Sequence, residues 1–183
     1  MTVTGPELDG LSDDVLPWDD PALRRPATPV VDVTAEVINT ARHMTDVLRR
    51  LGIRQALGVA ANQLGSPLSM FTYFADRDET VATVLNPKIS DGAGEKLYLE
   101  GCLSIPGMFW WIDRPKQVLL RGQNINGNDV EVEADNALAR LFQHELDHLE
   151  GRLILDRLPR GVQKQAQRKL AEARRLQPKE RDR

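Results

Sequence analysis

The stretch DNALARLFQHELDHL, residues 135–149, predicts a helix that contains the pattern H-E-x-x-H. Its apolar residues recur at helical spacing, and Gly151 is placed to end it. In such a helix His144 and His148 project from one face, one turn apart, with Glu145 beside them. The chain has only three histidines, and two of them fall here. We therefore predict a metal-binding helix rather than a polar helix with two solvated histidines.

A catalytic metal site of this kind needs a third protein ligand and an open position for water. No histidine follows the pattern, so on that side only Glu150, Asp156 or more distant acids could bind the metal. Upstream lies Cys102, the only cysteine of the chain. A lone cysteine is most often a small buried hydrophobe, but a thiolate binds a borderline metal more strongly than a carboxylate, so we favour Cys102. A small peptidase that uses a downstream carboxylate is the alternative.

Outward from this helix, helical and strand patterns divide the chain. Apolar residues between Asp32 and Gly52 recur at helical spacing, with Asp32 or Thr34 as N-cap and Gly52 at the end. Stretches rich in β-branched and aromatic residues predict strands, mostly antiparallel, at residues 68–74, 81–85, 117–121 and 130–132. Asn-Gly-Asn at residues 126–128 favours a hairpin, and a last helix is expected over residues 162–176. The predicted fold class is α+β.

The composition is that of one globular domain: 183 residues, 41% hydrophobic and 28% charged. We expect residues 1–14 to form a flexible acidic leader, residues 15–177 a single catalytic domain, and residues 178–183 a short charged tail. The longest apolar run, residues 108–112, is far shorter than the roughly 18 residues of a membrane helix. A single cysteine and an N-terminus without a signal-peptide pattern favour a reducing cytoplasm.

Charge is distributed unevenly along the chain. Residues 1–20 contain six acids and no base, whereas from Arg160 onward nine bases and three acids give a net charge of +6. A charge run is usually a solvated face. The basic end also fits a partner that is rich in phosphates.

Three segments resemble, in this order, the signature motifs of the peptide deformylases: GVAANQ at 58–63, EGCLSIP at 100–106 and QHELDHL at 143–149. The similarity also includes residues 20–30 and extends over residues 15–176. This family removes the formyl group from the N-terminal formylmethionine of new bacterial or organellar polypeptides. The resemblance implies antiparallel or mixed β-sheets packed around a central helix with the metal-binding histidines, together with an N-terminal and a C-terminal helix.

The resemblance also assigns roles to individual residues. The metal ligands that it implies are Cys102, His144 and His148. Glu145 would be the general acid and base, while Gln63 and the backbone N–H of Leu103 would hold the formyl oxygen. It implies one divalent metal ion, with Fe²⁺ favoured and Zn²⁺, Ni²⁺ or Co²⁺ as replacements.

Substrate binding is expected beside the first motif. Gly58 allows a substrate backbone to approach closely and to add as a strand, and Leu57 and Leu141 are the candidates for the methionine pocket. The chain departs from the family pattern at Ala56, where a glycine is usual. It also departs at residues 107–111, GMFWW, which are unusually aromatic. We expect these aromatic residues to fill the core; the alternative is a hydrophobic rim for the nascent chain.

The expected partners are N-formyl-methionyl nascent peptides and the ribosome, the latter through the basic C-terminal helix, with no membrane and no sequence-specific nucleic acid. A non-catalytic ribosome-binding module is a third interpretation, which the complete set of ligands and base disfavours. Glu100 is predicted to pair with Arg114 and to fix the Cys102 loop. Asp147 supports an imidazole or the cap region of the helix, or it is exposed, and His43 is expected to face solvent.

Overall fold

The computed structural model describes residues 2–4, 14–52 and 56–176, and it confirms an α+β fold. The α-helices are α1 (Ala35–Leu51), α2 (Asn136–Leu149) and α3 (Arg160–Leu176). Short 3₁₀ helices are η1 (Pro21–Arg24), η2 (Ala61–Leu64) and η3 (Ile154–Arg157). The strands are β1 (Thr2–Thr4), β2 (Gly58–Ala60), β3 (Met70–Phe74), β4 (Val81–Cys102), β5 (Ile105–Gln123) and β6 (Asp129–Asp135).

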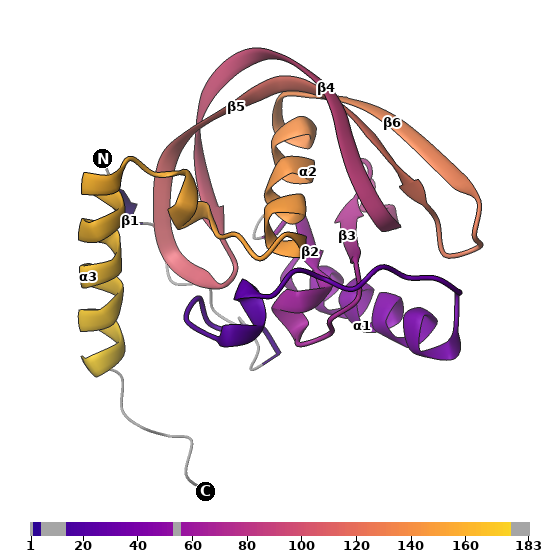
Figure 1. Cartoon of the computed structure of the whole chain (residues 1–183), viewed down its shortest axis with the longest axis horizontal. Coiled ribbons are helices and arrows are strands. Elements are labelled where there is room, and N and C mark those ends of the chain that lie inside the picture. The colour runs from indigo at the N-terminus through magenta and orange to yellow at the C-terminus, as the bar shows by residue number, and fades with distance from the viewer. Residues whose placement is uncertain (1, 5–13, 53–55, 177–183) are drawn as a thin grey trace, which may run out of the picture.

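The strands form one antiparallel sheet in the order β1-β5-β4-β3-β2, and β6 also pairs with β5. Figure 1 shows β4 and β5 as a long arch that curves over α2, with β2 and β3 below it. Because β2 pairs only with β3, it is an edge strand of this sheet. β2 also contacts α2, the helix that carries His144 and His148.

Both predicted long helices form because their apolar stripes are buried. The side chain of Thr34 caps α1 by accepting a hydrogen bond from the backbone N–H of Val37, and Gly52 ends the helix with a φ of 73°. α1 packs Met44 and Leu48 against β2 and β3. α2 packs Phe142 against the other layer of aromatic and aliphatic side chains on β3, β4 and β5. The sheet is therefore held between these two helices.

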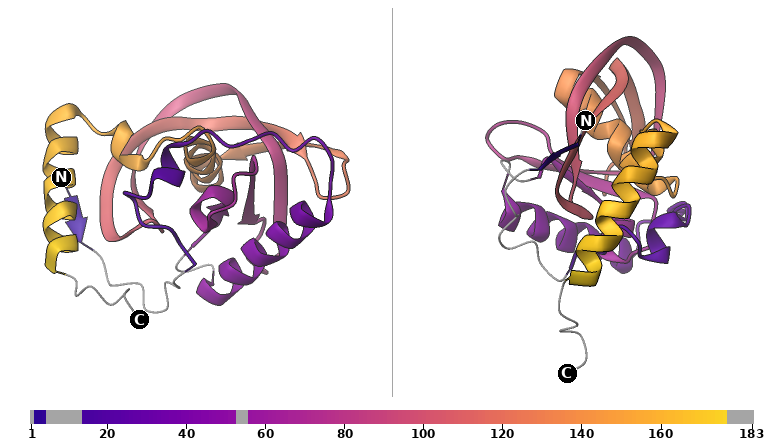
Figure 2. Two further views of the ribbon diagram at one scale, coloured as in Figure 1. Left: turned by 60° about the horizontal axis from the view of Figure 1, so that its bottom comes forward. Right: turned by 90° about the vertical axis from the view of Figure 1, so that its left-hand side faces the viewer.

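α3 stands at one end of the molecule beside β1 in both Figure 1 and Figure 2. Ala166 and Leu170 attach it to a third apolar cluster that contains Trp110 and Leu155. Its basic residues are exposed, and one of them, Arg174, forms an ion pair with Asp19. None of the described helices combines the length and apolarity needed to cross a bilayer.

β4 and β5 are far longer than predicted. The sequence pattern indicated residues 81–85 and 117–121, whereas the strands have 22 and 19 residues. Register shifts near residues 85–88, 90–93 and 101–102 interrupt the regular alternation of apolar and polar positions. In the middle of β4, residues 91–98 are mostly exposed, so burial imposes no alternation of apolar and polar residues on them. β2 was also missed as a strand, because it has only three residues.

Within the expected flexible acidic leader, residues 2–4 adopt regular structure. They form β1, which pairs with residues 108–110 of β5. At the other end of the leader, Asp14 forms an ion pair with Arg50 of α1 at 2.8 Å. Backbone pairing of this kind needs no side-chain period, so the composition of the segment could not reveal it. Residues 5–13 and the predicted tail, residues 178–183, lie outside the described residues.

Candidate active site

Three metal-ligating side chains converge between α2 and the end of β4. The Nε2 atoms of His144 and His148 are 3.2 Å apart, and the Sγ atom of Cys102 is 3.3 Å from the Nε2 atom of His148. All three side chains are buried, and their ligand atoms lie within 4.8 Å of one another. The helix supplies the histidines one turn apart, as the spacing predicted, and the β4–β5 turn brings the cysteine to them.

These residues fit a divalent metal ion. Ligands of one tetrahedral ion, at about 2.0–2.3 Å from it, are separated by about 3.3–3.6 Å, close to the separations found here. Two imidazoles and a thiolate are the donor set of a borderline metal such as Zn²⁺ or Fe²⁺. Among the described residues this is the only such group of three. Glu150 and Asp156, the alternative third ligands, instead pair with Arg152 and Arg24.

The Glu100 carboxylate orients His144 from the side of the ring opposite the metal position. Oε1 of Glu100 lies 2.7 Å from Nδ1 of His144, so the ring can donate there while Nε2 faces the metal position. The Glu100 carboxylate also accepts two hydrogen bonds from Arg114, at 2.7 and 3.0 Å, and one from Arg140, at 2.7 Å. The predicted pair of Glu100 and Arg114 is therefore confirmed, and it supports the ligand as well as the Cys102 loop.

The protonation of these groups follows from burial and from their partners. Burial alone would raise the pKa of Glu100, but its hydrogen bonds and the charges of His144 and Arg114 hold that pKa well below the usual range. Burial would lower the pKa of His144, yet the hydrogen bonds that its ring donates to Cys102 and Glu100 raise it. The pKa of His148 is lowered, first by burial and then by the charge of His144.

Removing the Glu100 carboxylate is expected to destabilise both the fold and the metal site. Glu100→Ala would leave Arg114 and Arg140 as buried charges with fewer partners, at a cost of about 3–5 kcal/mol in the free energy of unfolding. It should also weaken metal binding by roughly 10–100-fold, because His144 loses its orienting partner. Denaturant unfolding and competition with a chelator measure the two effects. The matched control is Glu131→Ala, which removes a half-exposed ion pair with Arg121 and should change stability by about 0–1 kcal/mol.

Asp147 is buried and does not bind an imidazole. Its carboxylate accepts hydrogen bonds from Arg114, at 2.8 Å, and from Arg157. Burial would raise the pKa of Asp147, but the hydrogen bond from Arg157 and the charge of Arg114 lower it. Of the sequence alternatives, exposure and direct support of a ring were therefore wrong. Asp147 instead pairs with Arg114 and with Arg152 and Arg157, which follow the end of α2. His43 is exposed, as predicted.

The sequence analysis missed three residues that position the site. Arg140 precedes His144 by one helical turn, and this spacing was the available signal that both reach the same carboxylate. Arg157 lies in η3, and no sequence pattern linked it to Asp147. Asn62 is buried, and its Nδ2 atom donates a 2.6 Å hydrogen bond to the backbone carbonyl of His148. Asn62 therefore connects the first motif to the end of α2.

Glu145 faces the same space as the metal ligands. Its carboxylate is buried, and Oε2 has no hydrogen-bond partner among the described residues. Burial is the main cause of a pKa raised to about 7, which the charge of His144 partly offsets. A side chain at Gly58 would approach within 3.2 Å of Glu145 Oε1 and 2.8 Å of Leu141 Cδ1. Only glycine at this position keeps the approach to the carboxylate open.

Gln63 presents its amide N–H group to the site. Its Oε1 atom accepts a 3.0 Å hydrogen bond from the backbone of Ala60, which fixes the orientation of the amide. Nε2 then points toward Sγ of Cys102, at 3.7 Å, and Oγ of Ser104, at 3.3 Å. Leu103 follows the cysteine in the β4–β5 turn, and its side chain is buried. The sequence-predicted oxyanion donors thus border the metal ligands.

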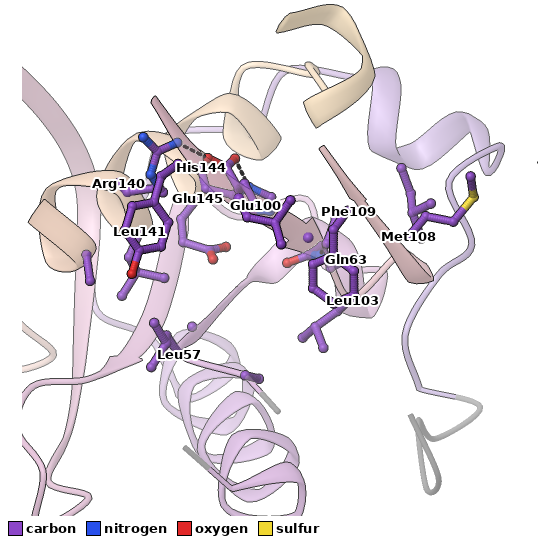
Figure 3. A pocket seen from close by; sticks show the side chains of 18 of the residues that line it. Leu57, Gln63, Glu100, Leu103, Met108, Phe109, Arg140, Leu141, His144 and Glu145 are labelled. Atoms are coloured by element: carbon purple, nitrogen blue, oxygen red, sulfur yellow. Dashed lines mark hydrogen bonds and ion pairs between the residues drawn. The ribbon is translucent and has the colours of Figure 1, made fainter. Parts of the chain in front are cut away.

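One pocket of about 230 Å³ is lined by Gln63, Cys102, Leu103, His144 and Glu145 (Figure 3). Leu57, Gly58 and Leu141, the predicted substrate-binding residues, are all part of its wall. Leu141 is buried, whereas Leu57 is 43% exposed and lies at the edge of the pocket. Ala56, the departure from the family pattern, is buried and also lines the pocket. The aromatic run divides: Trp110 is fully buried, Phe109 lines the pocket and Trp111 is 49% exposed, so only part of it fills the core.

A helix-borne H-E-x-x-H pair next to a buried cysteine, together with a buried glutamate whose Oε2 atom has no partner among the described residues, is typical of a metal-dependent hydrolase. The model of the polypeptide deformylase family matches residues 12–164, and the chain belongs to this family. The peptide deformylase of Parafrankia sp. (strain EAN1pec) is 40% identical over 155 residues, which cover 84% of this chain and 82% of that protein. That of Psychrobacter cryohalolentis is 34% identical over 168 residues, 91% of this chain and 90% of that protein.

Solved structures agree with this assignment. A crystal structure of a peptide deformylase from Legionella pneumophila has a TM-score of 0.81 at 30% identity and covers 91% of this chain and 97% of that one. The peptide deformylase from Thermotoga maritima has a TM-score of 0.72 at 34% identity and covers 79% and 96%. The prediction of the family from three short motifs is therefore confirmed, and the small-peptidase alternative is set aside.

Proposed function

We propose that this pocket binds the N-terminus of a formylated peptide with the formyl group between Gln63 and the metal ligands, and that Glu145 transfers the protons. The chain is an enzyme of the deformylase family, which removes the formyl group from N-terminal methionine in a metal-dependent reaction. One observation carries the proposal: a buried carboxylate oxygen without a partner among the described residues and an oriented amide share a pocket with Cys102 and His144, and His148 lies directly beside these two.

The metal would be held by Cys102, His144 and His148. A divalent ion there supplies Lewis acidity, which lowers the pKa of water from about 15.7 toward 7. The thiolate and imidazole donors suit Fe²⁺, our proposal for the metal in the cell, and also Zn²⁺, Ni²⁺ or Co²⁺ as replacements. The Glu100 carboxylate keeps the His144 ring in the orientation that ligation requires.

Glu145 is suited to accept and return a proton. A pKa of about 7 lets the carboxylate take a proton from the attacking water and then give it to the departing amine nitrogen. Its Oε2 atom has no competing partner among the described residues. Both transfers occur in a site that burial keeps poor in water, where electrostatic interactions are strong.

Two neutral donors would stabilise the oxygen that becomes negative in the tetrahedral intermediate. The Gln63 amide is already oriented by its bond to Ala60, and the backbone N–H of Leu103 is the second donor. Loss of one such donor typically costs about 3 kcal/mol of transition-state stabilisation. A neutral amide also keeps the same charge across the working pH range, so it donates at any pH at which Glu145 is active.

The peptide backbone would add to the free edge of β2. That strand pairs only with β3, and Gly58 leaves room for a close approach. Leu57 and Leu141 would contact the methionine side chain, with Leu141 in the buried wall of the pocket and Leu57 at its exposed edge. Backbone pairing recognises any sequence, which suits an enzyme that acts on many nascent chains.

The deciding experiment is formate release from formyl-Met-Ala-Ser by protein prepared without oxygen, with metal content measured on the same sample. We expect formate in proportion to bound metal and no product from acetyl-Met-Ala-Ser, because the larger acyl group does not fit between Gln63 and the ligands. Cleavage of the peptide bonds without formate would instead indicate a peptidase and would refute the proposal.

We also propose that α3 contacts the ribosome. Lys164, Arg168 and Lys169 are exposed on it, while Ala166 and Leu170 hold the helix to the core. Reversing the three charges to glutamate should weaken cosedimentation with ribosomes and reduce the slope of log K against log salt by up to about three.

Three exposed bases elsewhere provide the matched control for α3. Changing Arg77, Lys88 and Lys116 to glutamate alters the net charge equally and should leave ribosome binding nearly intact. Equal loss in both triple variants would show that net charge, rather than α3, determines the binding.

A further inference from the structure

The two histidines of the metal site differ in the support that their rings receive. Nδ1 of His144 lies 2.7 Å from a carboxylate oxygen of Glu100. His148 directs its Nε2 atom to the same position, 3.2 Å from Nε2 of His144, but its own Nδ1 atom is buried and has no hydrogen-bond partner among the described residues. A metal-bound imidazole almost always donates its other ring N–H to a carboxylate, a carbonyl or a water. One expected contact of His148 is therefore unassigned.

Asn62 is a side chain that already binds to the same residue. It lies in η2, is 3% exposed, and donates a 2.6 Å hydrogen bond from Nδ2 to the backbone carbonyl of His148. That carbonyl belongs to the last turn of α2, where it also accepts a hydrogen bond from the backbone N–H of Gly151. Asn62 thereby fixes the backbone from which the His148 ring projects.

The other atom of the Asn62 amide is available as an acceptor. Oδ1 of Asn62 is buried and has no partner among the described residues. The same part of the chain contains two further buried side-chain atoms of this kind, Nδ1 of His148 and Oε2 of Glu145. Glu145 lines the proposed substrate pocket, whereas Asn62 and His148 do not. An acceptor and a donor thus remain on two residues that one hydrogen bond already joins, outside the pocket wall.

Metal ligation determines which of these two atoms donates. When Nε2 of His148 holds the metal, the neutral ring carries its proton on Nδ1, so Nδ1 is a donor. Oδ1 of Asn62 can only accept. A buried donor and a buried acceptor that stay unpaired are both costly. No direct hydrogen bond joins the two atoms, and one buried water with roughly two to four polar partners can connect such groups.

We propose that Asn62 is a positioning residue for the metal ligand His148: its Nδ2 atom holds the backbone carbonyl, and its Oδ1 atom accepts the Nδ1–H group of the ring through one bound water. The proposal rests on the proposed metal site and gives Asn62 the role toward His148 that Glu100 has toward His144. Because Asn62 does not line the pocket, it acts on the affinity and geometry of the metal site rather than on substrate.

The test follows the ring N–H groups by NMR in the zinc-loaded protein with ¹⁵N-labelled histidine. The chain has only three histidines and His43 is exposed, so two slowly exchanging ring N–H signals are expected, one from His144 and one from His148. Asn62→Ala should remove the His148 signal by rapid exchange, while the His144 signal, which depends on Glu100, remains. If Asn62 only stabilised the fold, its loss would change neither signal.

Metal affinity gives the second measurement. In competition with a chelator, Asn62→Ala should bind Zn²⁺ roughly 10–100-fold more weakly than the unaltered protein. Asn62→Thr, whose hydroxyl group can both donate and accept, should recover part of that loss. Asn86→Ala is the matched control. Asn86 also holds a backbone carbonyl, that of Val30 at 2.8 Å, but it does not line the pocket and contacts no metal ligand, so zinc affinity should be unchanged.

Two results would overturn the role of Asn62 while leaving the metal site intact. One is equal zinc affinity in Asn62→Ala and Asn86→Ala. The other is a His148 ring N–H in the unaltered protein that exchanges as fast as that of exposed His43. This second result needs no variant, so it applies even if Asn62→Ala fails to fold. Zinc loading that leaves the His148 ring signals unchanged would instead refute the proposed metal site itself.

Discussion

Glu145→Gln is expected to lower kcat for formate release by roughly 10²–10⁴-fold while the protein keeps its metal. Glutamine preserves the size and the hydrogen-bonding reach of the side chain but cannot accept a proton from water. The three metal ligands are other residues, so metal content measured by elemental analysis should match that of the unaltered enzyme. The combination of retained metal and lost activity would separate proton transfer from metal binding.

The stability of this variant gives a second readout. Glu145 is buried without an ion pair among the described residues, so its replacement by a neutral amide removes no favourable pair. We expect an unfolding midpoint equal to or above that of the unaltered enzyme. Glu150→Gln, an exposed neighbour on the same chain segment, is the control and should keep full activity. Full activity in Glu145→Gln would rule out the carboxylate as the proton carrier.

Cys102→Ser should deplete the bound metal and the activity together. A serine hydroxyl is a far weaker ligand than a thiolate at neutral pH, since it is not deprotonated. The loss of metal affinity should exceed the 10–100-fold typical for a residue that only supports a ligand. Dialysis against graded chelator concentrations, followed by metal analysis, measures it.

Asp156→Asn is the matched comparison for the third ligand. Asp156 was the downstream candidate, but it pairs with Arg24 on the surface of η1 and η3. Its replacement should leave the metal content unchanged. The opposite pattern, with metal lost in Asp156→Asn and kept in Cys102→Ser, would mean that the histidines bind metal with a carboxylate.

The helix that carries the histidines could be predicted because its apolar residues recur at helical spacing. Its H-E-x-x-H motif also lies within five consecutive residues, so it can be recognised without knowledge of the fold. The same holds for α1, where Thr34 and Gly52 mark both ends. The cysteine was found from chemistry rather than periodicity, because the histidine pair lacked one ligand. Resemblance of three motifs then assigned the family, which the comparisons confirm.

The arginine network could not be predicted in the same way. Arg114 joins Glu100 and Asp147, which are separated by many residues and lie on different elements. Such pairs depend on the arch of β4 and β5, and most of that arch is exposed and carries register shifts. Sequence periodicity detects a buried face. It does not predict the length of a hairpin whose strands are mostly exposed and are held together by backbone hydrogen bonds.

The chain has a single cysteine, and in the structure it is buried in the wall of the pocket. A coordinated thiolate is shielded from alkylating reagents, whereas the sulfur of an emptied site can react. Maleimide can therefore label only one thiol in this protein, and no other cysteine contributes to the signal. The labelled fraction, followed over time by mass spectrometry, would report the rate at which the metal ion dissociates.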